Sequence, residues 1–111
     1  MERSSLETLF RALDRAGARY LVVGGLAVVA HGYLRLTLDV DLVLDLEPPH
    51  PAPALEAFRE LELVPLVPVG LEQFADAAVR RSWAVEKHAR VFQLWSERHP
   101  TLRVDLFLEP P

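Results

Sequence analysis

Residues 20–46, with the sequence YLVVGGLAVVAHGYLRLTLDVDLVLDL, decide which fold this chain can adopt. They contain the only adjacent pair of glycines, Gly24 and Gly25, followed by two carboxylates, Asp39 and Asp41, in an apolar run. Residues two apart in a strand project from the same face, so a strand here sets both carboxylates side by side. Their repulsion favours protonation, and a divalent cation that takes oxygens from both removes that cost. The pattern therefore predicts a metal site on a β-strand.

Apolar periodicity and turn residues predict helices and strands on both sides of this stretch. Ser4 and Glu7 form a capping box before an amphipathic helix that we expect to end at Gly17. The glycine pair is expected to end a strand. The elements expected after the first helix are a central strand at 19–23, a buried helix at 26–31, the longest strand at 36–46, a helix at 54–61, an edge strand at 63–70, a short helix at 71–79, loose strand-like alternation over 81–96, and a hairpin of strands 89–96 and 102–108.

This order of elements predicts the fold class. We expect a single α+β domain over residues 1–111, with a short mixed β-sheet backed by helices in the order α-β-α-β-insertion-β-β. The two tryptophans, Trp83 and Trp95, are expected to belong to its core.

Composition and charge exclude several classes of protein. Half of the 111 residues are hydrophobic and a quarter are charged, which is typical of a globular domain and not of a disordered chain or a coiled coil. No apolar run is long enough to span a bilayer and the N-terminus lacks a signal-peptide core, so we expect a cytoplasmic protein with no membrane partner. The chain has no cysteine, which excludes thiolate metal sites, and its net charge of −4 argues against non-specific binding to nucleic acid.

A third carboxylate repeats the pattern of the first two. Asp105 lies between Val104 and Leu106 in the last expected strand. If that strand neighbours the strand of Asp39 and Asp41, all three carboxylates meet on one patch of the sheet. Such a cluster can hold two Mg²⁺ ions roughly 3.5–4 Å apart, which stabilise the attacking and leaving oxygens of a phosphoryl displacement. Upstream, a glycine pair at the junction of a strand and a helix would let backbone N–H groups approach a phosphate.

These motifs resemble those of the polymerase-β-like nucleotidyltransferase superfamily. They are Gly24-Gly25, then R-x-T-x-D-x-D over residues 35–41, then the apolar-D-apolar motif centred on Asp105. The stretch GGLAVVAHGYLRLTLDVDL is most similar to the small prokaryotic branch, which contains the minimal nucleotidyltransferases and the abortive-infection (AbiEii-like) toxin-type nucleotidyltransferases. The resemblance covers a third of the chain and leaves residues 47–101 unmatched.

The resemblance implies a reaction. A nucleoside monophosphate would move from an NTP to an acceptor hydroxyl, with release of pyrophosphate. Asp39 and Asp41 would hold both catalytic metals, Mg²⁺ or alternatively Mn²⁺. Asp105 would complete the shell of the first metal and orient or deprotonate the acceptor hydroxyl. The base of the NTP stays open, as does the acceptor, which can be a protein, an RNA or a small molecule.

The same resemblance implies the nucleotide contacts. Gly24 and Gly25 would bind the triphosphate, and Arg35 and Thr37 occupy positions that are often polar in the toxin-like branch. The superfamily usually has Gly-Ser where this chain has Gly-Gly, so a hydroxyl that can touch phosphate or metal is missing.

Two alternatives remain open from the sequence. The first is an interaction protein, the small member of a toxin–antitoxin-like pair, which would bind a helical protein partner or form a homo-oligomer. The second is a catalytically silent nucleotide-binding domain or a fragment of a longer enzyme. For Asp39 and Asp41 themselves, the alternative to a metal site is the solvated face of an edge strand.

Overall fold

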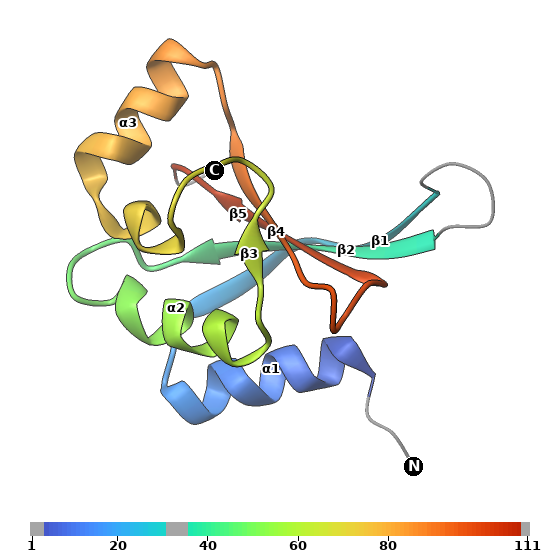
Figure 1. The fold of residues 1–111 in the computed structure, drawn as a ribbon. Coiled ribbons are helices and arrows are strands. Elements are labelled where there is room, and N and C mark those ends of the chain that lie inside the picture. The colour runs from blue at the N-terminus through green and yellow to red at the C-terminus, as the bar shows by residue number, and fades with distance from the viewer. Residues whose placement is uncertain (1–3, 31–35, 110–111) are drawn as a thin grey trace.

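A mixed β-sheet forms the centre of the computed structural model, which describes residues 4–30 and 36–109 (Figure 1). The sheet has five strands in the order β1-β2-β5-β4-β3. β2 and β5 are parallel, and the other neighbouring strands are antiparallel. The strands are β1 (Tyr20–Ala30), β2 (Leu36–Leu44), β3 (Val64–Pro65), β4 (Val91–Trp95) and β5 (Leu102–Phe107). The expected α+β class and the mixed sheet are confirmed.

The helices lie on one side of this sheet. α1 (Ser5–Ala16) and α2 (Pro51–Glu60) pack side by side, and the short 3₁₀ helix η1 (Leu71–Ala75) leads into α3 (Ala77–Glu86) (Figure 1). The Ser4 hydroxyl oxygen accepts a hydrogen bond from the backbone N–H of Glu7 at 3.1 Å, and Gly17 ends α1 with a φ of 73°. Both ends of the first helix are therefore where the capping residues predict them. None of the helices in the described residues is long and apolar enough to cross a membrane.

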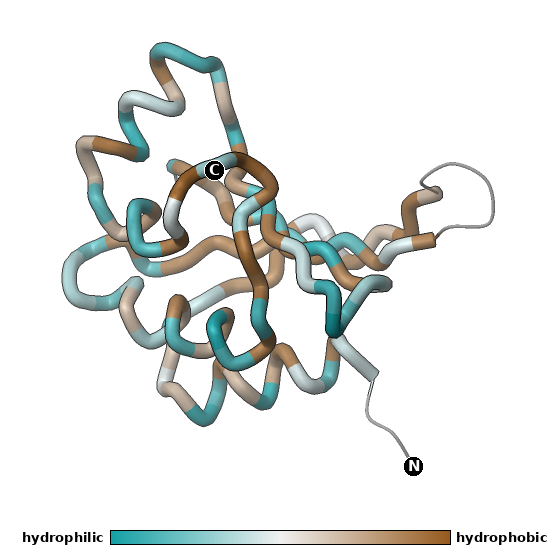
Figure 2. The backbone as a smooth tube through the Cα atoms, in the orientation of Figure 1, coloured by the Kyte–Doolittle hydropathy of each residue, from teal (hydrophilic) through white to brown (hydrophobic). Residues whose placement is uncertain are grey.

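Alternation along the strands builds the core. From Val40 onward in β2 and throughout β5, every second side chain is buried, and the side chains between them lie on the opposite face. Figure 2 shows hydrophobic residues concentrated along the strands. The buried strand residues and their helical partners include Val40, Leu42, Leu44, Val104, Leu106, Leu9, Leu13, Leu55 and Phe58. No described helix covers the opposite face, which carries Asp39, Asp41 and Asp105.

The prediction that the glycine pair ends a strand and begins a helix is wrong over residues 20–30. β1 continues through Gly24 and Gly25 as one strand, with a register shift between Val23 and Leu26, so no helix follows the glycine pair up to Ala30. β1 is an edge strand and also the longest one, not a central strand covered on both faces. Its sequence is almost wholly apolar and includes four valines, a composition that suits a strand as well as a buried helix, and apolar runs of this kind do not distinguish the two.

Smaller corrections concern residues 71–96. The expected helix at 71–79 is divided, because Asp76 adopts an extended backbone after η1 and its side chain caps α3 by accepting hydrogen bonds from two backbone N–H groups. The first half of the alternating segment 81–96 therefore belongs to α3. The hairpin of β4 and β5 is confirmed, and β3 lies at the sheet edge as its prolines predict.

Candidate functional site

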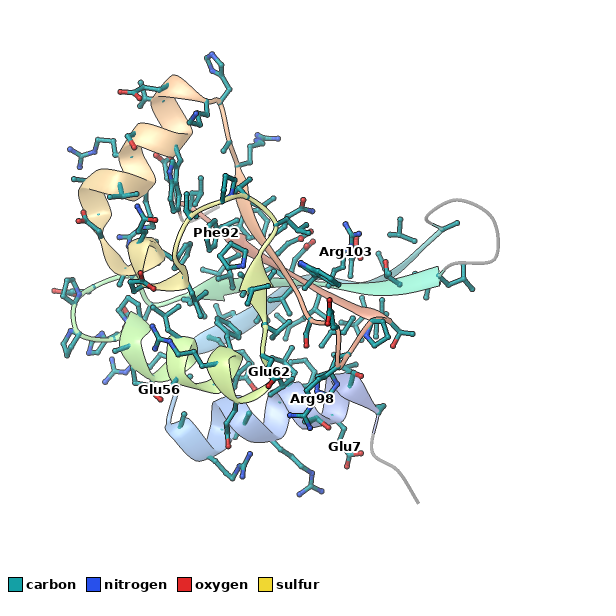
Figure 3. All side chains as sticks on the ribbon, viewed as in Figure 1. Glu7, Glu56, Glu62, Phe92, Arg98 and Arg103 are labelled. Carbon is teal, nitrogen blue, oxygen red and sulfur yellow. The ribbon has the colours of Figure 1, made fainter. Side chains whose placement is uncertain are left out.

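The acidic face, which we define as Asp39, Asp41 and Asp105, is assembled by the parallel pairing of β2 with β5. Asp39 and Asp41 are two apart on β2 and share a face of the sheet. In the register of the two strands, Asp105 lies directly opposite Asp41, and Arg103 lies opposite Asp39. The fold thus brings together the three carboxylates although more than sixty residues separate them in the sequence. Figure 3 labels Arg103 on β5 beside this face.

Asp105 experiences the closest crowding of negative charge. Burial of its carboxyl raises the pKa, because desolvation disfavours the charged form, and the nearby Asp39 and Asp41 raise it further. The side-chain amide of Gln93 on β4 donates a hydrogen bond to Asp105 Oδ1 at 3.1 Å and acts in the opposite direction. The net direction is upward, so Asp105 holds its proton more tightly than an exposed aspartate does.

Two further side chains support the acidic face from β2 and β5. The Thr37 hydroxyl donates a hydrogen bond to Asp39 Oδ1 at 3.1 Å, and Thr37 is only 3% exposed. Thr37 therefore orients a carboxylate, and the structure does not present it as an open contact for a nucleotide. Arg103 places a positive charge in the row next to Asp39. It is the basic residue nearest to the carboxylates in the strand register.

The sequence did not single out Gln93 and Arg103 as site residues. The signal that could have found Gln93 was the hairpin of β4 and β5, because its register sets Gln93 opposite Asp105. Arg103 could have been found from its spacing, since it lies two residues before Asp105 and so shares its face.

Gly24 lies next to the acidic face, but in a β-bulge. Its φ is +67°, a left-handed conformation that other residues adopt only at a cost, and a Cβ at this position would lie 3.6 Å from Asp41 Oδ2. Gly25 follows it within β1. Gly24 is therefore close to Asp41, but without the helix N-terminus that the sequence predicted for a phosphate. His31 and Arg35, the former at the end of the expected helix, lie outside the described residues.

The acidic face has the donor chemistry for a hard cation. Carboxylate oxygens are the ligands that Mg²⁺ prefers. Burial is the largest cause of the raised pKa of Asp105, and a cation would relieve the smaller part that comes from Asp39 and Asp41. Within residues 4–30 and 36–109, however, no group of three or more His, Asp or Glu side chains is already arranged around a common point as a metal would require. The residues fit magnesium by type and by shared face, and a bound ion would have to draw the carboxylates together.

Comparison with known proteins adds no relative: no family model, no curated protein and no solved structure matches the chain.

Proposed function

We propose that the protein is a magnesium-dependent nucleotidyltransferase whose active site is the acidic face. The observation that carries the proposal is the pairing of Asp41 with Asp105 across two parallel strands, with Asp39 next along the same face. The resemblance of the Gly-Gly and R-x-T-x-D-x-D motifs supports it independently. Three carboxylates on one sheet face repel one another, and a bound cation would offset that repulsion.

In the proposed reaction, the acceptor hydroxyl oxygen forms a bond to the α-phosphorus of an NTP. The bond between that phosphorus and the oxygen bridging to the β-phosphate breaks, and pyrophosphate leaves with the bonding electrons. The hydroxyl proton goes to Asp105, which lies opposite Asp41 on the neighbouring strand. Asp39 and Asp41 would hold Mg²⁺, which supplies positive charge for the phosphate oxygens. Thr37 keeps Asp39 in position through its hydrogen bond.

The test measures transfer and pyrophosphate release together. The purified chain is incubated with Mg²⁺, each of the four α-labelled NTPs and a cell lysate separated into protein, RNA and small-molecule fractions. We expect label in one fraction and an equal amount of pyrophosphate, and we expect Asp41→Asn to abolish both while keeping its circular dichroism spectrum. Glu86→Gln, on the exposed surface of α3, removes a carboxylate elsewhere and is the matched control. Absence of label and pyrophosphate with all four NTPs would refute the proposal.

A second candidate, an interaction protein, is favoured by the apolar surface of β1. Leu21 is 67% exposed and Val28 70% exposed, both on an edge strand whose outer backbone is unpaired in the described part of the chain. Exposed apolar edge strands promote pairing with another chain. In this case the chain co-purifies with a partner or with itself, Val28→Lys abolishes that association, and no NTP is consumed.

A further inference from the structure

A pocket of about 310 Å³ lies between residues 66–69, the end of α3 and β4. Its lining includes Val67 and Pro68 from the segment after β3, Trp83 and Lys87 from the end of α3, and Phe92 from β4. Figure 3 labels Phe92 where the segment after β3 passes β4, and Figure 2 shows that this segment is hydrophobic. The pocket belongs to a part of the chain that the family resemblance does not cover.

The aromatic wall of this pocket is ordered by packing. The rings of Trp83 and Phe92 are stacked, with centroids 4.9 Å apart and planes 9° apart. Phe92 also stacks on Phe74, which is fully buried, so the wall is continuous with the core. Stacking against a fixed neighbour restricts the Trp83 ring before any ligand arrives, which lowers the entropy that binding would lose. Opposite it, Leu66 and Val67 remain 41% and 53% exposed.

Apart from the indole N–H of Trp83, the polar side chains of the lining are those of Lys87 and Gln93, and Lys87 is a cation. Lys87 caps the C-terminus of α3, and within residues 4–30 and 36–109 it forms no ion pair. Gln93 lines the pocket as well, and its amide hydrogen-bonds Asp105. No carboxylate lines the pocket, so its charge complements an anion and not a cation.

We propose that this pocket binds a small, planar organic anion, with an aromatic body between Trp83 and residues 66–69 and a single acidic group at Lys87. Its volume lies at the lower end of the range of about 300–1,000 Å³ for small-molecule sites, which are mostly apolar with a few polar groups that orient the ligand. The proposal does not depend on nucleotidyl transfer.

The test uses a matched pair of probes. Anilinonaphthalene sulfonate has a planar aromatic body and one anionic group, and phenylnaphthylamine has the same aromatic body without the charge. We expect saturable binding of the sulfonate with one site per chain. In the NMR spectrum, binding should shift the indole N–H signal of Trp83 and not that of Trp95, the two being assigned with Trp95→Phe.

Substitutions in the pocket have controls on the same helix. Lys87→Gln should weaken binding of the sulfonate about threefold, the size expected for a surface ion pair, and leave phenylnaphthylamine binding unchanged. Arg81→Gln, an exposed charge of α3 outside the lining, should change neither. Ala89→Leu, which places a larger side chain in the lining, should weaken both probes about tenfold, and Ala77→Leu at the start of α3 should weaken neither.

Two results would overturn the proposal. One is equal binding of the probes by the Ala89→Leu and Ala77→Leu variants, or a shift of the Trp95 indole N–H signal in place of the Trp83 signal. Either result would locate the probes elsewhere, for example on β1. The other is equal loss of both probes in Lys87→Gln, which would show that the site does not select an anion. Each variant is first compared with the parent chain by circular dichroism, so that loss of fold is not taken for loss of binding.

Discussion

At the scale of single residues, the acidic face makes stability depend on pH through Asp105. The pKa of Asp105 is raised in the folded state, first by burial and then by its carboxylate neighbours. A raised carboxyl pKa gives stability that is complete below the unfolded pKa of about 3.9 and is lost as pH rises through the folded pKa. At neutral pH the charged Asp105 therefore opposes folding.

Asp105→Asn should accordingly stabilise the protein, and only when Asp105 would be charged. We expect Tm to rise by about 3 °C near pH 7, from roughly 0.5 kcal/mol of relieved cross-strand repulsion, and to be nearly unchanged near pH 3. Thermal denaturation at several pH values measures the difference between variant and parent. The Tm difference between Glu86→Gln and the parent chain should not increase with pH. A variant that is less stable at neutral pH would mean that the charged carboxylate is stabilised where it lies.

Gly24 gives a second prediction at this scale, with Gly17 as its control. Both have positive φ, +67° and +73°, and neither has an atom so close that an added Cβ would clash. Gly24→Ala and Gly17→Ala should therefore each cost about 1 kcal/mol of backbone strain, measured by urea denaturation. Only Gly24→Ala adds a methyl group beside Asp41, so only it should also lower metal-dependent activity. Equal metal-dependent activity in the two variants would show that the bulge at Gly24 does not contribute to the site.

At the scale of elements, the exposure of residues in β1 distinguishes the observed edge strand from the buried helix expected from the sequence. Val28 and Val40 lie on neighbouring strands, yet Val28 is 70% exposed and Val40 is fully buried. Val40→Ala should cost about 2 kcal/mol of unfolding free energy, and Val28→Ala less than about 0.5 kcal/mol. Chemical denaturation of both variants tests this. A loss of similar size in both would mean that residues 26–30 are buried, as the sequence predicted.

Local signals predicted those elements whose ends carry distinctive residues. Ser4 and Gly17 predicted the ends of the first helix, and the alternating segments 89–96 and 102–108 predicted the hairpin of β4 and β5. Residues 20–30 have no such signal, because a glycine pair can end a strand or form a bulge within it. The choice depends on whether Val23 and Leu26 can pair with β2, a contact between distant parts of the chain.

The difference between local signals and contacts of distant residues also explains which parts of the candidate site could be predicted. Asp39 and Asp41 were predicted to share a face because the period of a strand is local. That Asp105 joins them was predicted only on the condition that its strand neighbours theirs, and the parallel register of β2 and β5 meets that condition. Gln93 acquires its role from a hydrogen bond across the hairpin of β4 and β5, and the hydrogen bond of Thr37 to Asp39 gives Thr37 an orienting role in place of the expected nucleotide contact.

At the scale of the whole molecule, the sheet has helices on one face and carboxylates on the other. The core residues of β2 and β5 face α1 and α2, so the two strands that carry the acidic face are also the best anchored ones. Side chains held by such strands are positioned more accurately than side chains on loops. A cation bound there would connect β2 to β5 through the centre of the fold, and binding would be coupled to global stability.

Magnesium should therefore stabilise the protein as a whole. A ligand that binds only the folded state adds about 2.7 kcal/mol at one hundred times its dissociation constant, so we expect Tm to rise with Mg²⁺ concentration and to return to its starting value with EDTA. Asp41→Asn should start with a Tm equal to or above that of the parent, since a carboxylate pair is removed, and should gain little from Mg²⁺. Glu86→Gln should respond as the parent does. If Mg²⁺ raises the Tm of Asp41→Asn and of the parent equally, the ion acts elsewhere on the surface and the acidic face is not its site.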